Sequence, residues 1–196
     1  MKLKKDVNYI VSGLERSGTS MLMQILEAGG LSLAFDTESR PPDENNPKGY
    51  FELEGGKVIN KLMDGQFPLE KYKGRFVKIT AFGLKFLPPG KYKIIYSRRN
   101  MEEILDSMEK MARIDDKDRD ATRNAFTKLD KMIRNLISER DDIDVLFFDY
   151  NQTLQDPAKS AAEINEFLEI GDLDIEEMTA AVDKRLYRNR KAGKEK

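Results

Sequence analysis

The chain has 196 residues, enough for one domain with a full hydrophobic core, and 39% of them are hydrophobic while 35% are charged. Its 34 basic and 35 acidic side chains leave a formal net charge of −1, which gives no global attraction to nucleic acid or to an anionic membrane. Cysteine and histidine do not occur, which excludes disulfides, thiolate or imidazole zinc sites, cysteine nucleophiles and a Ser-His-Asp triad.

The N-terminal segment is basic, but Asp6 and Asn8 interrupt it before any apolar run of signal-peptide length. No stretch of the sequence approaches the length and hydrophobicity of a membrane span. We therefore expect a cytoplasmic protein with one domain over residues 1–196, in which the basic residues 188–196 have the composition of a flexible tail.

Four short runs of β-branched and aromatic residues have the nearly continuous hydrophobicity of parallel strands buried on both faces. These runs lie at residues 8–13, 75–80, 93–98 and 144–150. Helical patterns fill the gaps between them. Together they predict an α/β fold of three α/β/α layers with a central, mostly parallel sheet.

The predicted helices have recognisable apolar stripes and ends. The stripe that begins at Met21 ends at Gly29-Gly30, and another runs from Phe126 to Ile137. Asp156 followed by Pro157 predicts the start of a helix that continues to about Leu168.

The first polar turn, VSGLERSGTS at residues 11–20, connects the first predicted strand to a helix. Backbone N–H groups converge at such a helix start, where the helix dipole favours negative charge, so the turn predicts an anion site. Arg16 adds a cation, Ser17, Thr19 and Ser20 add hydroxyls, and Gly18 allows the backbone to approach the anion closely. Because Thr19 stands where a Walker loop has lysine, an anion shorter than a triphosphate fits better. The alternative is an ordinary glycine-containing turn without a ligand.

A second polar cluster follows the strand predicted at 93–98. Arg99 stands at the carboxyl end of this strand, where open α/β sheets bind ligands, and Ser107 lies two turns along the next helix. Asn100 is the predicted cap of that helix, with Glu103 at the capping-box position. The alternative is a surface arginine and an ordinary helix serine.

Together the two clusters resemble the sulfotransferases that use 3′-phosphoadenosine 5′-phosphosulfate. In that family a [KR]-S-G-T-[ST] loop holds the 5′-phosphosulfate, and Arg16, Ser17, Gly18, Thr19 and Ser20 match it. A later R-N-P-x-[DE]-x-x-x-S segment holds the 3′-phosphate, and Arg99-Asn100 and Ser107 match it with Met101 in place of proline. Further similar stretches lie at residues 45–52, 75–100 and 147–157, so the resemblance covers about residues 8–170.

The resemblance implies a fold like that of P-loop nucleoside-triphosphate hydrolases, of the sulfotransferase type. It also implies transfer of a sulfuryl group to a hydroxyl or amine of a small-molecule or glycan acceptor, without a bound metal. Lys78 stands where cytosolic members have a catalytic lysine, and Thr80 replaces their catalytic histidine. Arg16 and Lys78 are the candidates to stabilise the departing oxygen. The basic residues 184–191 are either a further source of cations for the 3′-phosphate or a plain basic tail, and the sequence carries no signal of oligomeric state.

With no histidine, the general base must be a carboxylate or solvent, and we select Glu52 in the sequence KGYFE. It ends a loop rich in proline and glycine, of the kind that borders functional sites. Glu52 could instead begin the helix that contains Val58, where its charge would favour the helix N-terminus. Three other carboxylates compete for the role: Asp43, Glu44 and Glu54.

Two other functions fit parts of the sequence. A P-loop kinase or NTPase is favoured by Asp149, which ends an apolar strand like a Walker B element, and by Ser20 at the Mg²⁺-ligand position. A non-catalytic nucleotide-binding protein of the same fold would account for the missing histidine and the short chain.

Overall fold

The computed structural model describes residues 3–36, 49–113 and 115–183. Five parallel strands form one sheet in the order β2-β3-β1-β4-β5. The strands are β1 (Asn8–Gly13), β2 (Leu33–Ala34), β3 (Phe76–Lys78), β4 (Tyr92–Arg98) and β5 (Ile143–Asp149). Four of them were predicted within two residues, whereas β2 is too short to produce a hydrophobic pattern of its own.

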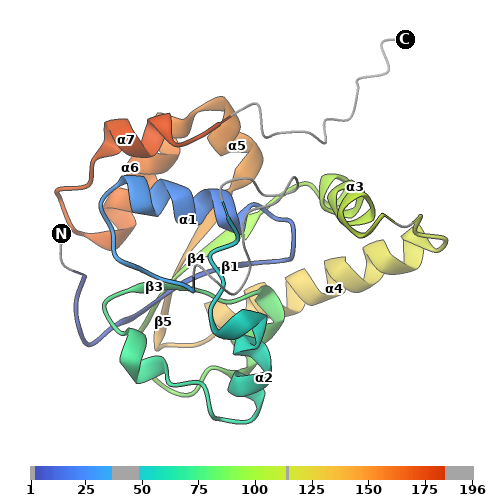
Figure 1. Cartoon of the computed structure of the whole chain (residues 1–196), viewed down its shortest axis with the longest axis horizontal. Helices are drawn as coiled ribbons and strands as arrows, with labels where there is room; N and C mark the ends of the chain where they lie inside the picture. Colours follow the sequence, from blue (N-terminus) through green and yellow to red (C-terminus); the bar gives the residue numbers. More distant parts are fainter. Residues whose placement is uncertain (1–2, 37–48, 114, 184–196) are drawn as a thin grey trace.

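Helices cover both faces of this sheet (Figure 1). On one side lie α1 (Thr19–Ala28), α5 (Tyr150–Gln155), α6 (Pro157–Leu168) and α7 (Ile175–Ala180). On the other lie α2 (Val58–Met63), α3 (Met101–Ala112) and α4 (Arg119–Ser138). The described residues also form three short 3₁₀ segments: η1 (Glu54–Gly56), η2 (Leu69–Tyr72) and η3 (Ala81–Phe86). The predicted three-layer α/β/α fold is confirmed.

The core is divided in two by the sheet. Successive side chains of a strand point to opposite faces, so Ile10 packs in the cluster on the α2 and α4 side, while Tyr9 and Val11 pack in the cluster on the α1 and α6 side. In β4 the same alternation places Ile94 on the first side and Ile95 on the second, both fully buried. Burial of each such side chain stabilises the fold by roughly 1.5 to 3 kcal/mol.

The predicted helix caps form at two positions. Asn100 accepts hydrogen bonds from the N–H groups of Glu102 and Glu103, and Asp156 accepts one from Lys159. The capping-box role predicted for Glu103 is wrong: the N–H of Asn100 donates to Asn151 Oδ1 at 3.3 Å, and the carboxylate of Glu103 faces Arg99 and Asn151. Glu103 therefore contacts Arg99 and Asn151 instead of the N–H of Asn100.

All five strands run in the same direction, so their carboxyl ends meet at one edge of the sheet. Gly13 ends β1, Lys78 ends β3, Arg98 ends β4 and Asp149 ends β5 at this edge. Among the described residues, no helix is long and apolar enough to cross a bilayer.

Candidate active site

The turn between β1 and α1 has the geometry of an anion loop. Arg16 adopts a left-handed backbone with φ 65°, and Gly18 follows with φ 103° before α1 begins at Thr19. Because the residue before the helix is glycine, it has no side chain with which to cap the first N–H groups of α1. The first N–H groups of α1 are thus left without a side-chain cap. They lie at the carboxyl edge of the sheet, where the dipole of the ten-residue helix favours an anion.

The hydroxyl of Ser17 is the clearest sign of a ligand inside this loop. The residue is 1% exposed, and Oγ has no hydrogen-bond partner among the described residues. A side chain at Gly13 would fill the same space, because a Cβ there would lie 2.4 Å from Ser17 Oγ. A buried hydroxyl without a partner costs about 1 to 3 kcal/mol. An oxygen of a phosphate or sulfate group would satisfy it.

Gly18 has a structural role besides its place in the loop. A Cβ at this position would lie 2.2 Å from Cδ2 of Tyr150, the first residue of α5. The guanidinium of Arg99 also lies against this ring, with its carbon 4.4 Å from the ring centre. Burial raises the pKa of the Tyr150 phenol. The sequence argument gave Gly18 only the approach of an anion, whereas the structure adds a left-handed φ and a packed tyrosine.

The two predicted phosphate clusters are in direct contact. Arg16 Nε donates to Ser107 Oγ at 2.9 Å, and Arg99 NH1 donates to the main-chain oxygen of Arg16 at 3.2 Å. Ser107 is 4% exposed and the Arg99 side chain is 7% exposed, so both contacts are partly buried. The folded chain thus brings together side chains that the sequence places about 90 residues apart.

Lys78 and Glu52 form a pair beside the same edge. Lys78 ends β3, its Nζ donates to the main-chain oxygen of Tyr50, and it lies 3.8 Å from Glu52 Oε1. The Lys78 side chain is 7% exposed and that of Glu52 is 23% exposed. Glu52 does not begin α2, because η1 separates the two and the N-cap of α2 is Lys57; its carboxylate nevertheless lies close to Gly56, where an added Cβ would be 3.3 Å from Oε2.

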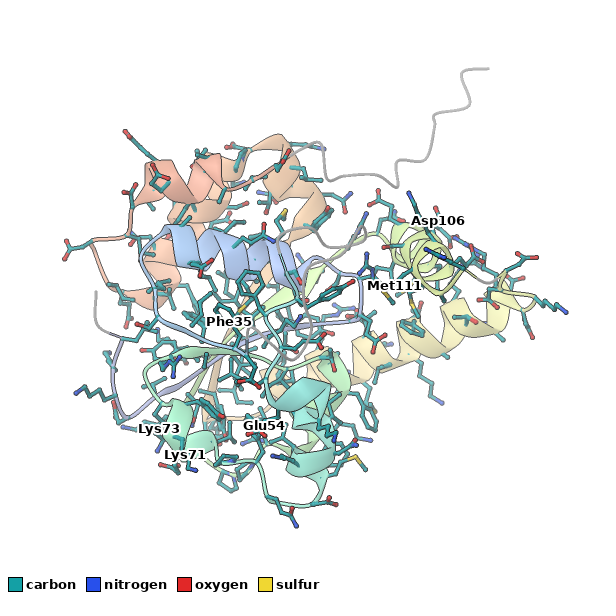
Figure 2. The ribbon with its side chains drawn as sticks, in the orientation of Figure 1. Phe35, Glu54, Lys71, Lys73, Asp106 and Met111 are labelled. Atoms are coloured by element: carbon teal, nitrogen blue, oxygen red, sulfur yellow. The ribbon has the colours of Figure 1, made fainter. Side chains whose placement is uncertain are left out.

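The competing carboxylate Glu54 has other partners. It accepts hydrogen bonds from Lys61 and, at 3.5 Å, from the hydroxyl of Tyr72. The hydrogen bond from Lys61 is the main reason why the pKa of Glu54 is lowered. Glu54 is the first residue of η1, and Figure 2 shows it close to α2. The candidates Asp43 and Glu44 and the basic segment 184–191 lie outside the described residues.

Asp149 does not have the environment of a Walker B aspartate. Its Oδ1 accepts the N–H of Gln152 at 2.9 Å and so caps α5. Strand β4 lies between β5 and β1, which places the end of β5 about 10 Å from the end of β1 at the usual strand spacing. The structure therefore gives Asp149 a helix-capping role at this edge.

Sequence reasoning missed Tyr150, Asn151 and the tertiary role of Glu103. Asn151 Nδ2 donates to both carboxylate oxygens of Glu103, at 3.1 and 3.2 Å. Their position in the sequence could have identified Tyr150 and Asn151, because both directly follow β5 and therefore lie at the same edge of the sheet as Arg99.

The model of the sulfotransferase domain family matches residues 6–195. The chain belongs to the sulfotransferase family. The sulfotransferase domain of the olefin synthase from Synechococcus PCC 7002 is a solved structure with the same fold, at 16% identity and a TM-score of 0.57, covering 95% of this chain and 80% of that one. An unliganded sugar kinase from Janibacter sp. HTCC2649 matches at 13% identity and a TM-score of 0.46, covering 92% of this chain and 99% of that one. No curated protein matches the chain significantly.

Family membership confirms the resemblance found in the sequence. It supports sulfotransferase activity in general for this chain. The loop and the arginine–serine segment that were matched to the family in the sequence contact each other at the carboxyl edge of the sheet. The residues at the carboxyl edge of the sheet determine which sulfuryl donor and which acceptor fit, and which side chains can take part in catalysis.

Proposed function

We propose that this sulfotransferase moves a sulfuryl group from 3′-phosphoadenosine 5′-phosphosulfate to a hydroxyl or amine of a small-molecule or glycan acceptor. The hydrogen bond between Arg16 and Ser107 is the observation that carries the proposal. It joins the loop suited to a 5′-linked anion to the segment suited to a 3′-phosphate. A nucleotide with groups at both positions spans such a site, whereas ATP has nothing to place at the second.

The residues present fit this donor. The first turn of α1 and the unpartnered hydroxyl of Ser17 would hold the 5′-phosphosulfate, with Thr19 and Ser20 in the same turn. Arg99 and Ser107 would hold the 3′-phosphate. When bound, the donor supplies an activated sulfuryl group whose leaving group is a phosphate oxygen.

Positive charge near the loop would stabilise the oxygen that departs from sulfur. Arg16 lies in the loop itself, and Lys78 ends the strand next to β1. Groups of this type act most strongly on charge that develops in the transition state, and loss of one well-placed donor costs about 3 to 4 kcal/mol. Both side chains are fixed by hydrogen bonds, Arg16 to Ser107 and Lys78 to Tyr50, so little reorganisation is required.

Glu52 is the proposed general base. It takes the proton from the acceptor hydroxyl or amine as that atom attacks sulfur, while the bond from sulfur to the phosphate oxygen breaks. Lys78 holds its carboxylate at the edge of the sheet through the contact of 3.8 Å. Glu54 is committed to Lys61 and Tyr72, which favours Glu52 over it.

The direct test is product formation by the full chain. We expect transfer of label from ³⁵S-labelled donor to at least one member of a pool of hydroxyl and amine acceptors, in the presence of EDTA. The variant Arg16→Ala should reduce turnover more than donor affinity, since Arg16 acts on charge that develops during transfer. Labelled product from γ-³²P-ATP with Mg²⁺ would instead identify a kinase. Tight donor binding without transfer to any acceptor would identify a non-catalytic binding protein.

A further inference from the structure

Glu103 is a buried carboxylate directly behind the proposed 3′-phosphate site. It lies in the first turn of α3, and its side chain is 9% exposed. Removing a carboxylate from water costs several kcal/mol unless donors surround it. Here Arg99 Nε donates to Oε2 at 3.0 Å, and Asn151 Nδ2 donates to both oxygens at 3.1 and 3.2 Å. These hydrogen bonds fix the position of the Glu103 carboxylate, and the carboxylate in turn fixes the positions of Arg99 and Asn151.

The contacts of Arg99 fix the plane of its guanidinium. Glu103 engages Nε, and the main-chain oxygen of Arg16 accepts from NH1 at 3.2 Å. The ring of Tyr150 lies against the guanidinium face, with the carbon 4.4 Å from the ring centre. The orientation of Arg99 relative to the loop is therefore determined from three directions.

Asn151 completes the support from a third element. Its Nδ2 donates to Glu103 and its Oδ1 accepts from the N–H of Asn100, so one amide joins α5 to the start of α3. Only one orientation of the amide makes both contacts, because the amide nitrogen must face the carboxylate. The result is a chain of contacts from Asn151 through Glu103 to Arg99.

We propose that Glu103, supported by Asn151, is a positioning residue that sets selectivity for a nucleotide with a 3′-phosphate over one with a 3′-hydroxyl. The inference rests on the proposed function, since it requires Arg99 to contact that phosphate. Glu103 acts through Arg99 and does not touch the nucleotide. Its negative charge lowers the total attraction for a phosphate dianion, so its benefit is the orientation of the guanidinium.

This role makes a prediction whose sign distinguishes it from a simple charge effect. Glu103→Gln removes one negative charge next to the proposed phosphate, and electrostatics alone would therefore strengthen binding of the 3′-phosphate. Loss of orientation weakens it instead: in glutamine one of the two oxygens becomes an NH₂ donor that would face the Asn151 Nδ2 donor, and the contact with Arg99 loses its charge. The measured quantity is the ratio of the Kd for AMP to the Kd for adenosine 3′,5′-bisphosphate.

The experiment compares the full chain with three variants by calorimetry, with circular dichroism as a check on folding. We expect the Kd ratio to fall about tenfold in Glu103→Gln, the effect of losing one charge-assisted hydrogen bond, and to fall in Asn151→Ala, which changes no charge. The matched control is Glu102→Gln, which removes the same charge one residue away, where the carboxylate faces Arg119 and Arg123. The control should keep the wild-type ratio.

A ratio that rises or stays unchanged in Glu103→Gln overturns the inference, as does an equal loss of affinity for both nucleotides. If Glu103→Gln does not fold, Asn151→Ala alone decides the question by the same ratio. A wild-type ratio near one would overturn the 3′-phosphate site itself. Failure of the proposed function can be distinguished from failure of the role of Glu103, because the first appears in the wild-type protein and the second only in the variants.

Discussion

Arg16 Nε donates a hydrogen bond to the hydroxyl of Ser107 across 2.9 Å, from the loop after β1 to the middle of α3. The main-chain oxygen of Arg16 in turn accepts from Arg99, which precedes α3. Loop and helix therefore form one site and not two. A nucleotide that carries anionic groups at both its 5′ and 3′ positions is the ligand class that such a site suits.

Replacement of Arg99 should affect both binding and stability. Arg99→Ala should weaken binding of adenosine 3′,5′-bisphosphate by about 1.5 to 3 kcal/mol, the value of a hydrogen bond to a charged group. It should also lower the free energy of unfolding by about 3 to 5 kcal/mol, because the buried carboxylate of Glu103 loses its cation. Calorimetry and urea denaturation measure the two effects.

A double variant separates these effects of Arg99. Arg99→Ala combined with Glu103→Ala removes the unpaired charge and should recover part of the stability, while the binding defect persists. If Arg99→Ala loses stability but binds the bisphosphate as the wild type does, Arg99 is a structural residue.

Gly18→Ala should destabilise the fold by on the order of 2 kcal/mol or more, since it combines an unfavourable φ with a steric clash. The new Cβ would lie 2.2 Å from Tyr150 in a backbone with φ 103°. The matched control is Gly65→Ala, where φ is 66° and no atom lies within 4 Å of the added carbon. The control should lose about 1 kcal/mol, from φ alone. Equal losses in thermal unfolding would show that Tyr150 moves aside freely.

Glu52→Gln should preserve nucleotide affinity and the Tm while lowering kcat by about 10² to 10⁴, the usual contribution of general-base catalysis. Its contact with Lys78 is long at 3.8 Å, and the buried Nζ of Lys78 keeps its hydrogen bond to the main-chain oxygen of Tyr50, so little stability depends on the charge of Glu52. Glu54→Gln is the control, and it should keep kcat because Glu54 faces Lys61 and Tyr72. Unchanged turnover in Glu52→Gln would remove this residue from the mechanism.

The contact between α3 and α4 should depend on pH through Glu102. Its pKa falls from an ordinary 4.5 to about 2, chiefly because Arg123 donates to it, with Arg119 as a second donor. A carboxylate with a lowered pKa contributes its full stabilisation above about pH 4.5 and loses it as the pH falls toward 2.

We therefore expect Glu102→Gln to lower the free energy of unfolding at pH 7 by up to about 1 kcal/mol, as for other ion pairs near the surface. The difference from wild type should shrink as the pH is lowered from 5 toward 3. The control Glu163→Gln, on an exposed pair with Lys159 at 4.0 Å, should change the free energy little at any pH. A difference for Glu102→Gln that stays constant over this pH range would contradict the assignment.

The elements that could be predicted from sequence are those with strong local signals. The continuous apolar runs of β1 and β4 are buried on both faces, so their hydrophobic pattern reports the fold directly. Asp156 and Pro157 define the start of α6 because a cap and a first-turn proline act within a few residues. By contrast, the two residues of β2 are a strand only because β3 lies beside them.

The site could be predicted as a set of residues but not as a network. Arg16, Arg99 and Ser107 were identifiable because each belongs to a local sequence motif that begins at the end of a strand. The partners of Glu103 were not, since the capping-box pattern gave it a local role that Arg99 and Asn151 displace. The requirement for glycine at position 18 likewise depends on a tyrosine more than a hundred residues later, which no local pattern reports.

The most direct test of the account is calorimetry of the full chain with three nucleotides: adenosine 3′,5′-bisphosphate, AMP and ATP with Mg²⁺. We expect the bisphosphate to bind at least about tenfold more tightly than AMP, since charge-assisted contacts to a second phosphate are each worth 1.5 kcal/mol or more. Its affinity should not change with EDTA, and ATP should bind weakly. Equal affinity for AMP and the bisphosphate, or tighter binding of ATP with Mg²⁺, would contradict a site built for a 3′,5′-substituted nucleotide.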